Sequence, residues 1–352
     1  MNLQERVEEY SRQNGLLSAG DTVLIGVSGG ADSVCLFLLL CGLRDAYDLK
    51  LHTICVDHGL REEAAEEAAY VKELSERYGA EFHTVRIDVE SYARSEHLSI
   101  EEAARDLRYA EFERCADGIG ATKIAVAHTR DDQAETVLYR LFRGTGLKGL
   151  PGMRAKSGRR IRPLLAVARA EIEEELAKRG VRYCTDASNE SDDYARNCIR
   201  HHILPEAVKI NAQAAAHIAA AAGQLLSAED YIRSQAETAY VACVTEYPSR
   251  EEGSGTAQGL SRVTVRVDGF LSLHPCLQER VLFTVMERLC GRMRDISAVH
   301  IRDLKGIFTL ETGKRLDLPY RMTAVKRREY VEVYAAGTSP YYKKGVSENG
   351  LP

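Results

Sequence analysis

The sequence predicts an α/β fold: a doubly wound parallel sheet, followed by a helical connector and a small α+β domain. Two observations carry this prediction. Four short apolar runs, at 22–27, 51–56, 82–87 and 122–127, read as strands, and amphipathic helical patterns separate them. Such alternation is typical of parallel sheets that helices cover on both faces. Ligands are then expected at the carboxyl ends of the strands.

Composition limits the class of protein. With 45% hydrophobic and 28% charged residues, the 352-residue chain is typical of a soluble globular protein with two or three domains. Its net charge is −5, so nucleic-acid binding would depend on local basic patches. Nine cysteines without a CxxC pair argue against a disulfide scaffold, a zinc ribbon or an iron–sulfur cluster.

Neither a membrane span nor a leader sequence is expected. The N-terminal segment is charged and lacks the apolar core of a signal peptide, and the longest apolar run, 34–43, is too short to cross a bilayer. We therefore expect a cytoplasmic protein without a membrane partner, in agreement with its scattered cysteines.

A glycine turn joins the first strand to the first helix of the sheet. This arrangement presents backbone N–H groups and the positive end of a helix dipole to an anion. Asp32 would repel a bare phosphate, so we expect Mg²⁺ between them, with Asp32 as the metal ligand. An ordinary tight turn is the alternative. The loop lacks the ending of a Walker A motif. The residues expected to bind the nucleotide here are Ser28, Gly29, Gly30, Ala31, Asp32 and Ser33.

This loop resembles the SGGxDS pyrophosphate loop of the ATP pyrophosphatases. Those enzymes cleave ATP between the α- and β-phosphates and pass an adenylate to their substrate. The resemblance implies ATP and Mg²⁺ as cofactors.

Polar residues also follow the second and fourth strands. His58 and Arg61 would face the same crevice as the glycine loop, where an arginine neutralises phosphate; a solvated turn is the alternative. After the fourth strand, Asp131, Asp132 and Glu135 converge if the segment is helical, with His128 just upstream. Three acids here can hold Mg²⁺ or an ammonium group. The alternative is a cluster that caps the helix, although capping requires only one acid.

Nine motifs occur in the order seen in tRNA(Ile)-lysidine synthetases, and this resemblance spans roughly residues 20 to 206. Two positions depart from the family pattern: Thr129, where a second histidine is common, and Asp57, where asparagine is frequent. The motifs are SGGADS (28–33), HGLR (58–61), EEAARDLRY (101–109), HTRDDQAET (128–136), RGTGL (143–147), RPLL (162–165), DASN (186–189), RNCIR (196–200) and LP (204–205).

The resemblance implies an adenine nucleotide alpha hydrolase-like fold and an enzyme that converts the wobble cytidine of tRNA(Ile), with anticodon CAU, to lysidine. ATP adenylates the cytidine at its C2 oxygen, and the amine of free L-lysine then expels AMP. By motif position, Asp131, Asp132 and Glu135 are assigned to lysine recognition or catalysis. Arg105 is placed near the lysine carboxylate, and His128 or a carboxylate accepts the amine proton. Members of this family are often dimeric.

A basic stretch, 140–169, contains nine Lys and Arg residues and no acid. A solvated loop is the ordinary interpretation of such a run. In an acidic protein, however, nine positive charges without a counter-charge indicate contact with a phosphate backbone. We expect this stretch to contact the anticodon arm of the tRNA. The residues assigned to tRNA binding are Arg143, Arg154, Lys156, Arg159, Arg160 and Arg162, together with Arg196 and Arg200 from the RNCIR motif.

The predicted domains are a catalytic domain (1–210), a helical connector with a flexible linker (211–259), a small α+β domain (260–336) and a polar tail (337–352). The small domain resembles the appended domain of longer lysidine synthetases. The tail leaves no room for the further C-terminal domain of those proteins.

Three other functions compete with the ligase. A tRNA thiolase of the same superfamily generally needs paired cysteines. A non-catalytic tRNA-binding protein would not need the intact loop and the three acids. A metabolic ligase acting on a small molecule would not need the basic stretch.

Overall fold

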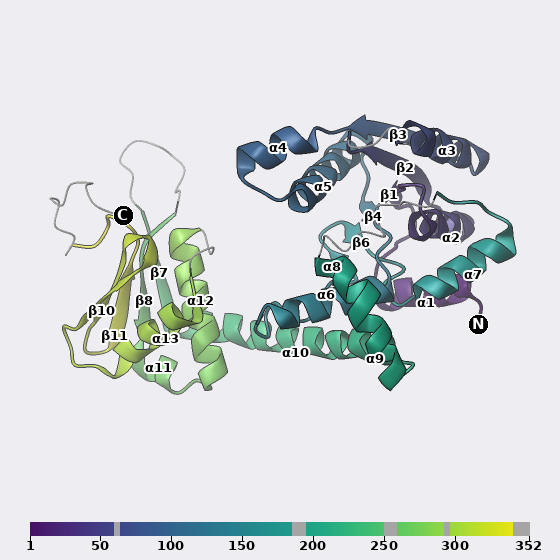
Figure 1. Ribbon diagram of the computed structural model, residues 1–352. Helices are drawn as coiled ribbons and strands as arrows, with labels where there is room; N and C mark the ends of the chain where they lie inside the picture. Colours follow the sequence, from purple (N-terminus) through teal and green to yellow (C-terminus); the bar gives the residue numbers. More distant parts are fainter. Residues whose placement is uncertain (60–63, 185–194, 250–258, 292–295, 341–352) are drawn as a thin grey trace. The chain divides into compact units, whose positions relative to one another are not determined.

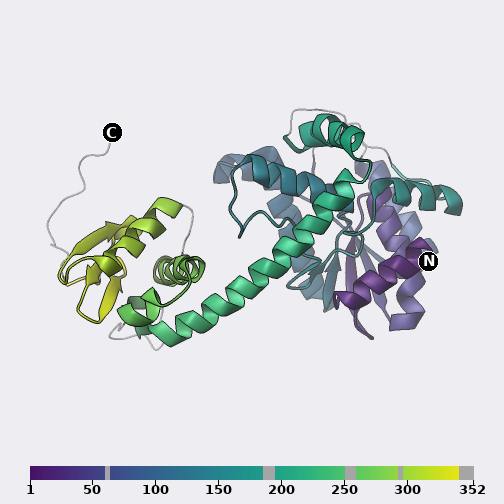
Figure 2. The same ribbon diagram turned by 90° about the horizontal axis from the view of Figure 1, so that it is seen from below.

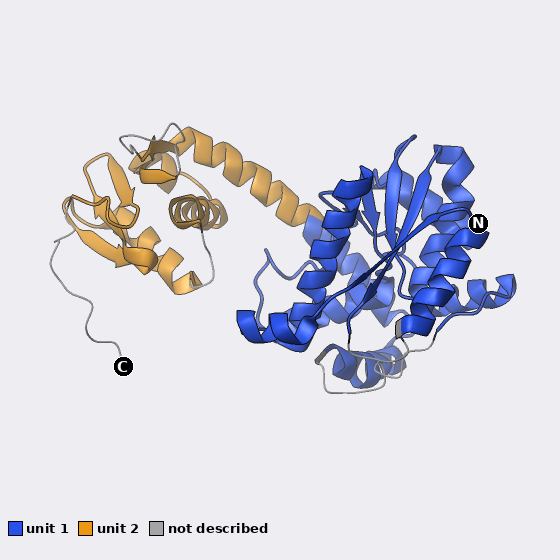
Figure 3. Ribbon diagram, turned by 90° about the horizontal axis from the view of Figure 1, so that it is seen from above, with its two compact units in different colours: residues 1–226 blue, residues 227–352 orange. Residues whose placement is uncertain are grey.

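The computed structural model describes residues 1–59, 64–184, 195–249, 259–291 and 296–340. Arg61, the DASN motif at 186–189, most of the expected linker and most of the expected tail lie outside these ranges. The chain forms two compact units, residues 1–226 and 227–352 (Figure 3). Within the described ranges, no helix has the length and apolar character that crossing a membrane requires.

The first unit is built on a six-stranded sheet with the order β3-β2-β1-β4-β6-β5 (Figure 1). All neighbouring strands run parallel except the short hairpin of β5 and β6. The structure therefore confirms the predicted parallel sheet and adds a hairpin that the sequence did not predict. The strands are β1 (Thr22–Gly26), β2 (Lys50–Asp57), β3 (Glu81–Arg86), β4 (Lys123–Ala125), β5 (Lys156–Ser157) and β6 (Arg160–Ile161).

Helices cover both faces of this sheet. In β1, Val23 and Ile25 pack into one core with α2 and α7, whereas Leu24 packs on the other face against Phe112 and Ala116 of α5. Alternate residues of one strand thus enter two cores, as expected for a strand buried on both faces. The helices are α1 (Leu3–Gln13), α2 (Ala31–Tyr47), α3 (Ala64–Arg77), α4 (Val89–Glu96), α5 (Ile100–Ile119), α6 (Arg130–Phe142), α7 (Arg169–Arg179), α8 (Ala195–Cys198) and α9 (Leu204–Ile210).

The direction of chain progression reverses at β1. Strands β2 and β3 lie on one side of β1, and β4 lies on the other. In open α/β sheets, a crevice forms outside the carboxyl ends of the strands where the order reverses. The fold therefore places the ligand crevice after β1 and β4, where the glycine loop and His128 follow.

The second unit contains an antiparallel sheet with the order β7-β8-β11-β10-β9. The long helix α10 (Ala214–Cys243) leads into it along the chain (Figure 2). Phe270 and Phe308 stack in its core with ring centroids 3.9 Å apart. Strand β7 lies within the range expected to be connector, and it pairs with β8. The elements are β7 (Val244–Pro248), β8 (Leu260–Arg266), α11 (Val267–Leu271), α12 (Pro275–Cys290), α13 (Ala298–Gly306), β9 (Arg315–Leu318), β10 (Met322–Lys326) and β11 (Tyr330–Tyr334).

Candidate active site

A cavity of about 640 Å³ opens at the carboxyl ends of β1, β2 and β4. Its volume is in the range of sites that bind small molecules and cofactors. Most of the predicted nucleotide-binding residues line it. From the predicted set, the lining includes Ser28, Gly30, Ala31, Asp32, Ser33, His58, His128 and Arg200.

The glycine loop is held by its own serines. The backbone N–H of Ser28 donates to Ser33 Oγ at 3.1 Å, and the Ser33 hydroxyl donates to the carbonyl of Gly30 at 2.9 Å. Gly30 is the N-cap of α2 and offers no side chain to the first turn. The N–H groups of that turn, which have no partner within the helix, are therefore left to bind an anion.

Cys184, which belongs to none of the predicted motifs, follows α7 in the chain and contacts the glycine loop. Its N–H donates to the carbonyl of Gly29 at 2.9 Å. Gly29 has a φ of +88°, and a Cβ there would lie 3.2 Å from the Cys184 sulfur. Both the left-handed backbone and the close approach of Cys184 therefore explain why glycine occupies this position.

Asp32 has one paired and one unpaired oxygen. Its Oδ2 accepts from Arg169 Nη2 at 3.0 Å, whereas Oδ1 is buried and has no hydrogen-bond partner among the described residues. Burial raises the pKa of this carboxyl group, and the nearby Arg169 opposes the rise. An unpaired carboxylate oxygen in a polar cavity fits a hard cation such as Mg²⁺, which takes oxygen ligands.

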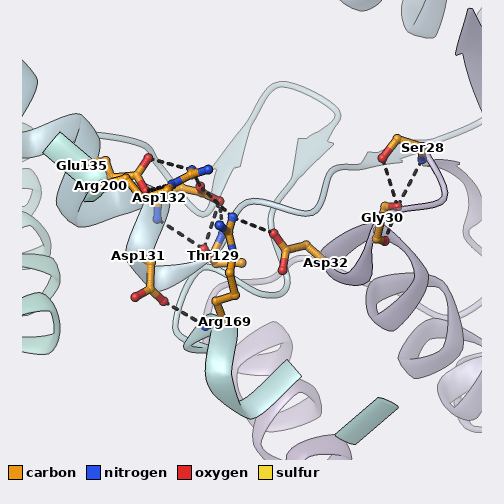
Figure 4. Close-up of polar contacts among 10 residues, drawn as sticks. Ser28, Gly30, Asp32, Thr129, Asp131, Asp132, Glu135, Arg169 and Arg200 are labelled. Carbon is orange, nitrogen blue, oxygen red and sulfur yellow. Dashed lines mark hydrogen bonds and ion pairs between the residues drawn. The ribbon is translucent and has the colours of Figure 1, made fainter. Parts of the chain in front are cut away.

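Two acids of α6 pair with a single arginine. Arg200 donates from Nε to Glu135 Oε1 at 2.6 Å and from Nη2 to Oε2 at 2.9 Å, and the same Nη2 lies 3.2 Å from Asp132 Oδ1 (Figure 4). Glu135 is only 3% exposed. Burial raises its pKa, while Arg200 lowers it. Arg200 was assigned to tRNA binding, but these contacts direct its guanidinium into the acid cluster. The residue lies on a π-helical turn, η2 (Ile199–Ile203).

Arg169 links this cluster to the glycine loop. Its Nη2 lies 3.0 Å from Asp32 Oδ2 and 3.7 Å from Asp132 Oδ1 (Figure 4). In the sequence, Arg169 stands out only as the last residue of the basic stretch (140–169). The structure therefore brings the loop acid and the α6 acids together through a residue that their motifs do not contain.

Asp131 points away from this group. Its Oδ2 accepts from the backbone N–H of Arg169 at 2.9 Å, at the start of α7 (Figure 4). Asp132 also has a capping role, because it forms a capping box with Thr129 at the start of α6. The alternative interpretation, capping of the helix that carries these acids, thus describes one role of Asp132, whereas Asp131 caps a different helix, α7. Among the described residues, the cavity lining includes none of Asp131, Asp132, Glu135, Gly29 and Arg105.

His128 lines the cavity as a neutral imidazole. Burial lowers its pKa well below the ordinary value, and Arg162, Arg108, Arg105 and Arg196 lower it further. Arg162 Nε donates to His128 Nδ1 at 3.2 Å. A neutral imidazole that accepts at Nδ1 carries its proton on Nε2, so the other nitrogen is a hydrogen-bond donor.

The lowered pKa of His128 predicts a pH dependence of stability. In the unfolded chain the histidine takes up a proton near its ordinary pKa of 6.5, while in the folded protein it stays neutral. The free energy of unfolding should therefore fall as pH drops below 6.5 toward the folded pKa, by up to about 1.4 kcal/mol per pH unit from this group. Denaturant unfolding of wild type and His128→Gln at several pH values checks this.

The variant should show the shallower slope, and equal slopes would contradict the prediction. Asp32 and Glu135 act in the opposite sense at lower pH, because their pKa values are raised. The comparison is therefore made near the upper end of the window. His97→Asn, a change at an exposed histidine, is the control.

Three arginine side chains form cation–π contacts with the ring of Tyr109. The guanidinium carbons of Arg105, Arg108 and Arg160 lie 5.6, 5.5 and 4.8 Å from the ring centroid. Arg108 and Tyr109 line the cavity, and burial lowers the pKa of Arg108. Cations that stack on an aromatic face keep their charge and can attract an anion. Arg105, predicted to lie near a lysine carboxylate, belongs to this group.

Acidic residues from outside the basic stretch neutralise part of its positive charge. Arg159 donates to Glu113 at 3.0 Å and to Asp117 at 2.6 Å, so α5 supplies its counter-charge. Arg162 is only 5% exposed, and its own Nη1 atom donates a hydrogen bond to the backbone carbonyl of Arg154 at 2.8 Å. Arg162, for which the sequence predicts a tRNA contact, therefore has internal partners in His128 and Arg154.

Comparisons with known proteins agree with this geometry. Residues 1–207 match the PP-loop domain family. The tRNA(Ile)-lysidine synthase of Dehalococcoides mccartyi is 36% identical over 91% of this chain and 68% of its own length. The chain belongs to the tRNA(Ile)-lysidine synthase family. The family member of Clostridioides difficile is 33% identical over 93% of this chain and 69% of its own. The resemblance stated from the motifs is thereby confirmed.

Other relatives match only the catalytic part or the fold. The tRNA(Ile)-lysidine synthase of Parabacteroides distasonis is 44% identical over 64% of this chain and 52% of its own length. Among solved structures, the U34-tRNA thiolase NcsA of Methanococcus maripaludis, with its [4Fe-4S] cluster, superposes with a TM-score of 0.55. It is 19% identical and covers 64% of this chain and 80% of that one, which shows a common fold.

Proposed function

We propose that this chain catalyses ATP-dependent ligation of free lysine to C2 of the wobble cytidine, position 34, of tRNA(Ile) with anticodon CAU. The observation that carries the proposal is a single arrangement: an anion-binding loop whose acid, Asp32, reaches the α6 acids through Arg169. The matched synthases support it, although the chain spans about two thirds of the length of the first two. None of its nine cysteines, all within the described ranges, is in a disulfide, which suits the cytoplasm.

In the first step the C2 oxygen of the cytidine attacks the α-phosphate of ATP, and pyrophosphate leaves. The first-turn N–H groups of α2 and the hydroxyls of Ser28 and Ser33 would hold the leaving pyrophosphate. Asp32 would hold Mg²⁺ through its unpaired oxygen, and the ion would supply charge neutralisation there. Arg108, stacked on Tyr109, adds a cation at the cavity wall.

In the second step the amine of lysine attacks C2, AMP leaves, and the amine loses a proton. Asp132 and Glu135 would bind the ammonium group, since together with Asp32 they place three acids around two arginines. A carboxylate is the better proton acceptor. Arg162 fixes the His128 tautomer that donates from Nε2, so His128 would orient the cytidine or a phosphate. Asp131 caps α7 and has no part in this proposal.

The test follows AMP release from ATP with a tRNA(Ile) transcript bearing CAU, with and without labelled lysine. Release that needs both substrates, with the label transferred to RNA, supports the ligase. Release that needs a sulfur donor and ignores lysine would assign the chain to the thiolases. No release with any donor would contradict an enzymatic function for this chain.

We further propose that the C-terminal end of α6 contacts the tRNA. Phe142 is 61% exposed, and the adjacent Arg143 stacks on Tyr139 at 5.5 Å. An exposed aromatic beside a stacked arginine suits an unpaired base and its phosphate. Arg140 donates to the carbonyls of Gly149 and Gly152, both at 2.7 Å, and shapes the loop that follows.

Phe142→Ala and Arg143→Ala are each expected to weaken tRNA binding about tenfold, because one base stack contributes about 1–3 kcal/mol. Arg143→Ala should also reduce the slope of log affinity against log salt by about 1. Titration of labelled tRNA at several salt concentrations measures both effects. Arg77→Ala, at an exposed arginine of α3 paired with Glu73, is the control. Unchanged affinity and slope in both variants would exclude this surface.

A further inference from the structure

A second polar cluster lies in the sheet, away from the cavity. His52 belongs to β2, and Glu81 and His83 belong to β3, the strand at the edge of the sheet. His52 and Glu81 are register partners in the parallel pair, and His83 follows two residues after Glu81. Because side chains of a strand alternate between faces, the three side chains share one face. They lie in the amino-terminal halves of their strands, whereas the cavity lies at the carboxyl ends.

Three ligand atoms converge in this cluster. His52 Nδ1 lies 3.2 Å from His83 Nε2 and 3.5 Å from Glu81 Oε2, and His83 Nε2 lies 3.9 Å from Glu81 Oε1. All three ligand atoms lie within 4.8 Å of one another. Ligands that are about 2.0–2.1 Å from a tetrahedral ion lie about 3.3–3.4 Å apart. The observed spacing of the two nitrogens is therefore close to what such an ion needs.

The environment suits a transition metal. The His52 side chain is 15% exposed and that of His83 is 24% exposed, so the imidazoles are shielded, while Glu81, at 67%, leaves an entry path. Two imidazoles and one carboxylate, with a fourth position open to water, form a donor set typical of zinc.

We propose that His52, Glu81 and His83 bind one divalent transition metal ion of the zinc class, which fastens the edge strand β3 to β2. The ion would take the place of the hydrogen bond between the two imidazoles. Fastening has a clear benefit at this place, because an edge strand pairs on one side only. Cys115 of α5 is a partly buried thiol; burial raises its pKa, Arg114 opposes the rise, and the charges of Glu111 and Glu81 add to it.

The test uses the full-length protein freed of metal with a chelator and titrated with Zn²⁺, and separately with Co²⁺ followed by visible absorption. We expect one equivalent bound per chain. His52→Asn and His83→Asn should each weaken binding at least about 100-fold, since even partners of ligands contribute 10–100-fold. Zn²⁺ should raise the melting temperature of wild type and leave that of His83→Asn unchanged.

Controls separate this site from other metal-binding groups. His97→Asn, at an exposed histidine in a left-handed conformation that asparagine tolerates, should bind like wild type. A thiolate-to-cobalt band that disappears in Cys115→Ala would identify the fourth ligand and support the site. No stoichiometric binding by wild type, equal binding by wild type and both histidine variants, or a thiolate band that persists in His83→Asn and Cys115→Ala would overturn the proposal. Because the ligands lie outside the proposed active site, His83→Asn should keep AMP-forming activity.

Discussion

Replacement of Asp32 by asparagine is expected to lower the rate of tRNA-dependent pyrophosphate release at least about 1,000-fold, which is the upper range for loss of one preorganised charge-stabilising group. The substitution removes the negative charge that would face the proposed nucleotide, but the amide oxygen can still accept from Arg169 at the same place. Stability should change little, because burial already disfavours the ionised carboxylate and raises its pKa. A pyrophosphate-release assay measures the rate, and denaturant unfolding checks the fold.

Asp132→Asn is the matched control for this prediction. Both residues contact Arg169 Nη2, at 3.0 and 3.7 Å, but only Asp32 lies in the first turn of α2. If Asp32 acts on the nucleotide, its variant loses the first step at saturating lysine. The Asp132 variant should mainly raise the lysine KM. Pyrophosphate release within tenfold of wild type in Asp32→Asn would contradict the assigned role.

Removal of the Glu135 side chain is expected to cost about 3 kcal/mol of stability. In Glu135→Ala the guanidinium of Arg200, whose side chain is 22% exposed, loses a bidentate partner, and among the described residues the acid that remains in contact is Asp132. A charge left partly buried without its partner costs about 3–5 kcal/mol, and the remaining acid favours the lower end. Urea unfolding monitored by circular dichroism measures the change.

The double variant Glu135→Leu with Arg200→Met tests the cause. Replacing both charges by apolar groups of similar volume is often neutral for stability, so the double variant should be more stable than Glu135→Ala. Its lysine binding should nevertheless be lost, because the acid is gone. A Glu135→Ala variant within 1 kcal/mol of wild type would show that Arg200 finds other partners.

The main sheet was predictable because its strands carry a strong local signal. Residues 22–27 form a compact β-branched run, and β1 (Thr22–Gly26) follows it closely. Strands β5 and β6 have two residues each, which is too few for an alternation of apolar and polar residues to appear, and they lie among glycines. Strand β7 follows α10 without a break, so no turn signal marks its start.

The site was predictable in its motifs but not in its pairings. The loop and the helix that begins at Arg130 are local features, and both lie where their sequences indicate. The contact between Asp32 and Arg169 joins residues 137 positions apart, and no local pattern encodes it. Likewise, Arg159 meets Glu113 only after folding places α5 beside the hairpin, so the stretch appeared uncompensated in the sequence.

The two arginines in the acid cluster are counter-ions that belong to the chain itself. Asp32, Asp132 and Glu135 each contact a guanidinium group. An ammonium group that binds here must therefore replace a guanidinium group as the partner of a carboxylate. Its affinity reflects the difference in free energy between the ion pair that forms and the one that breaks. Dissolved salt competes poorly with cations that are attached to the chain and partly shielded from solvent. Lysine uptake by such a site would depend weakly on ionic strength, whereas capture of the RNA would depend on it strongly.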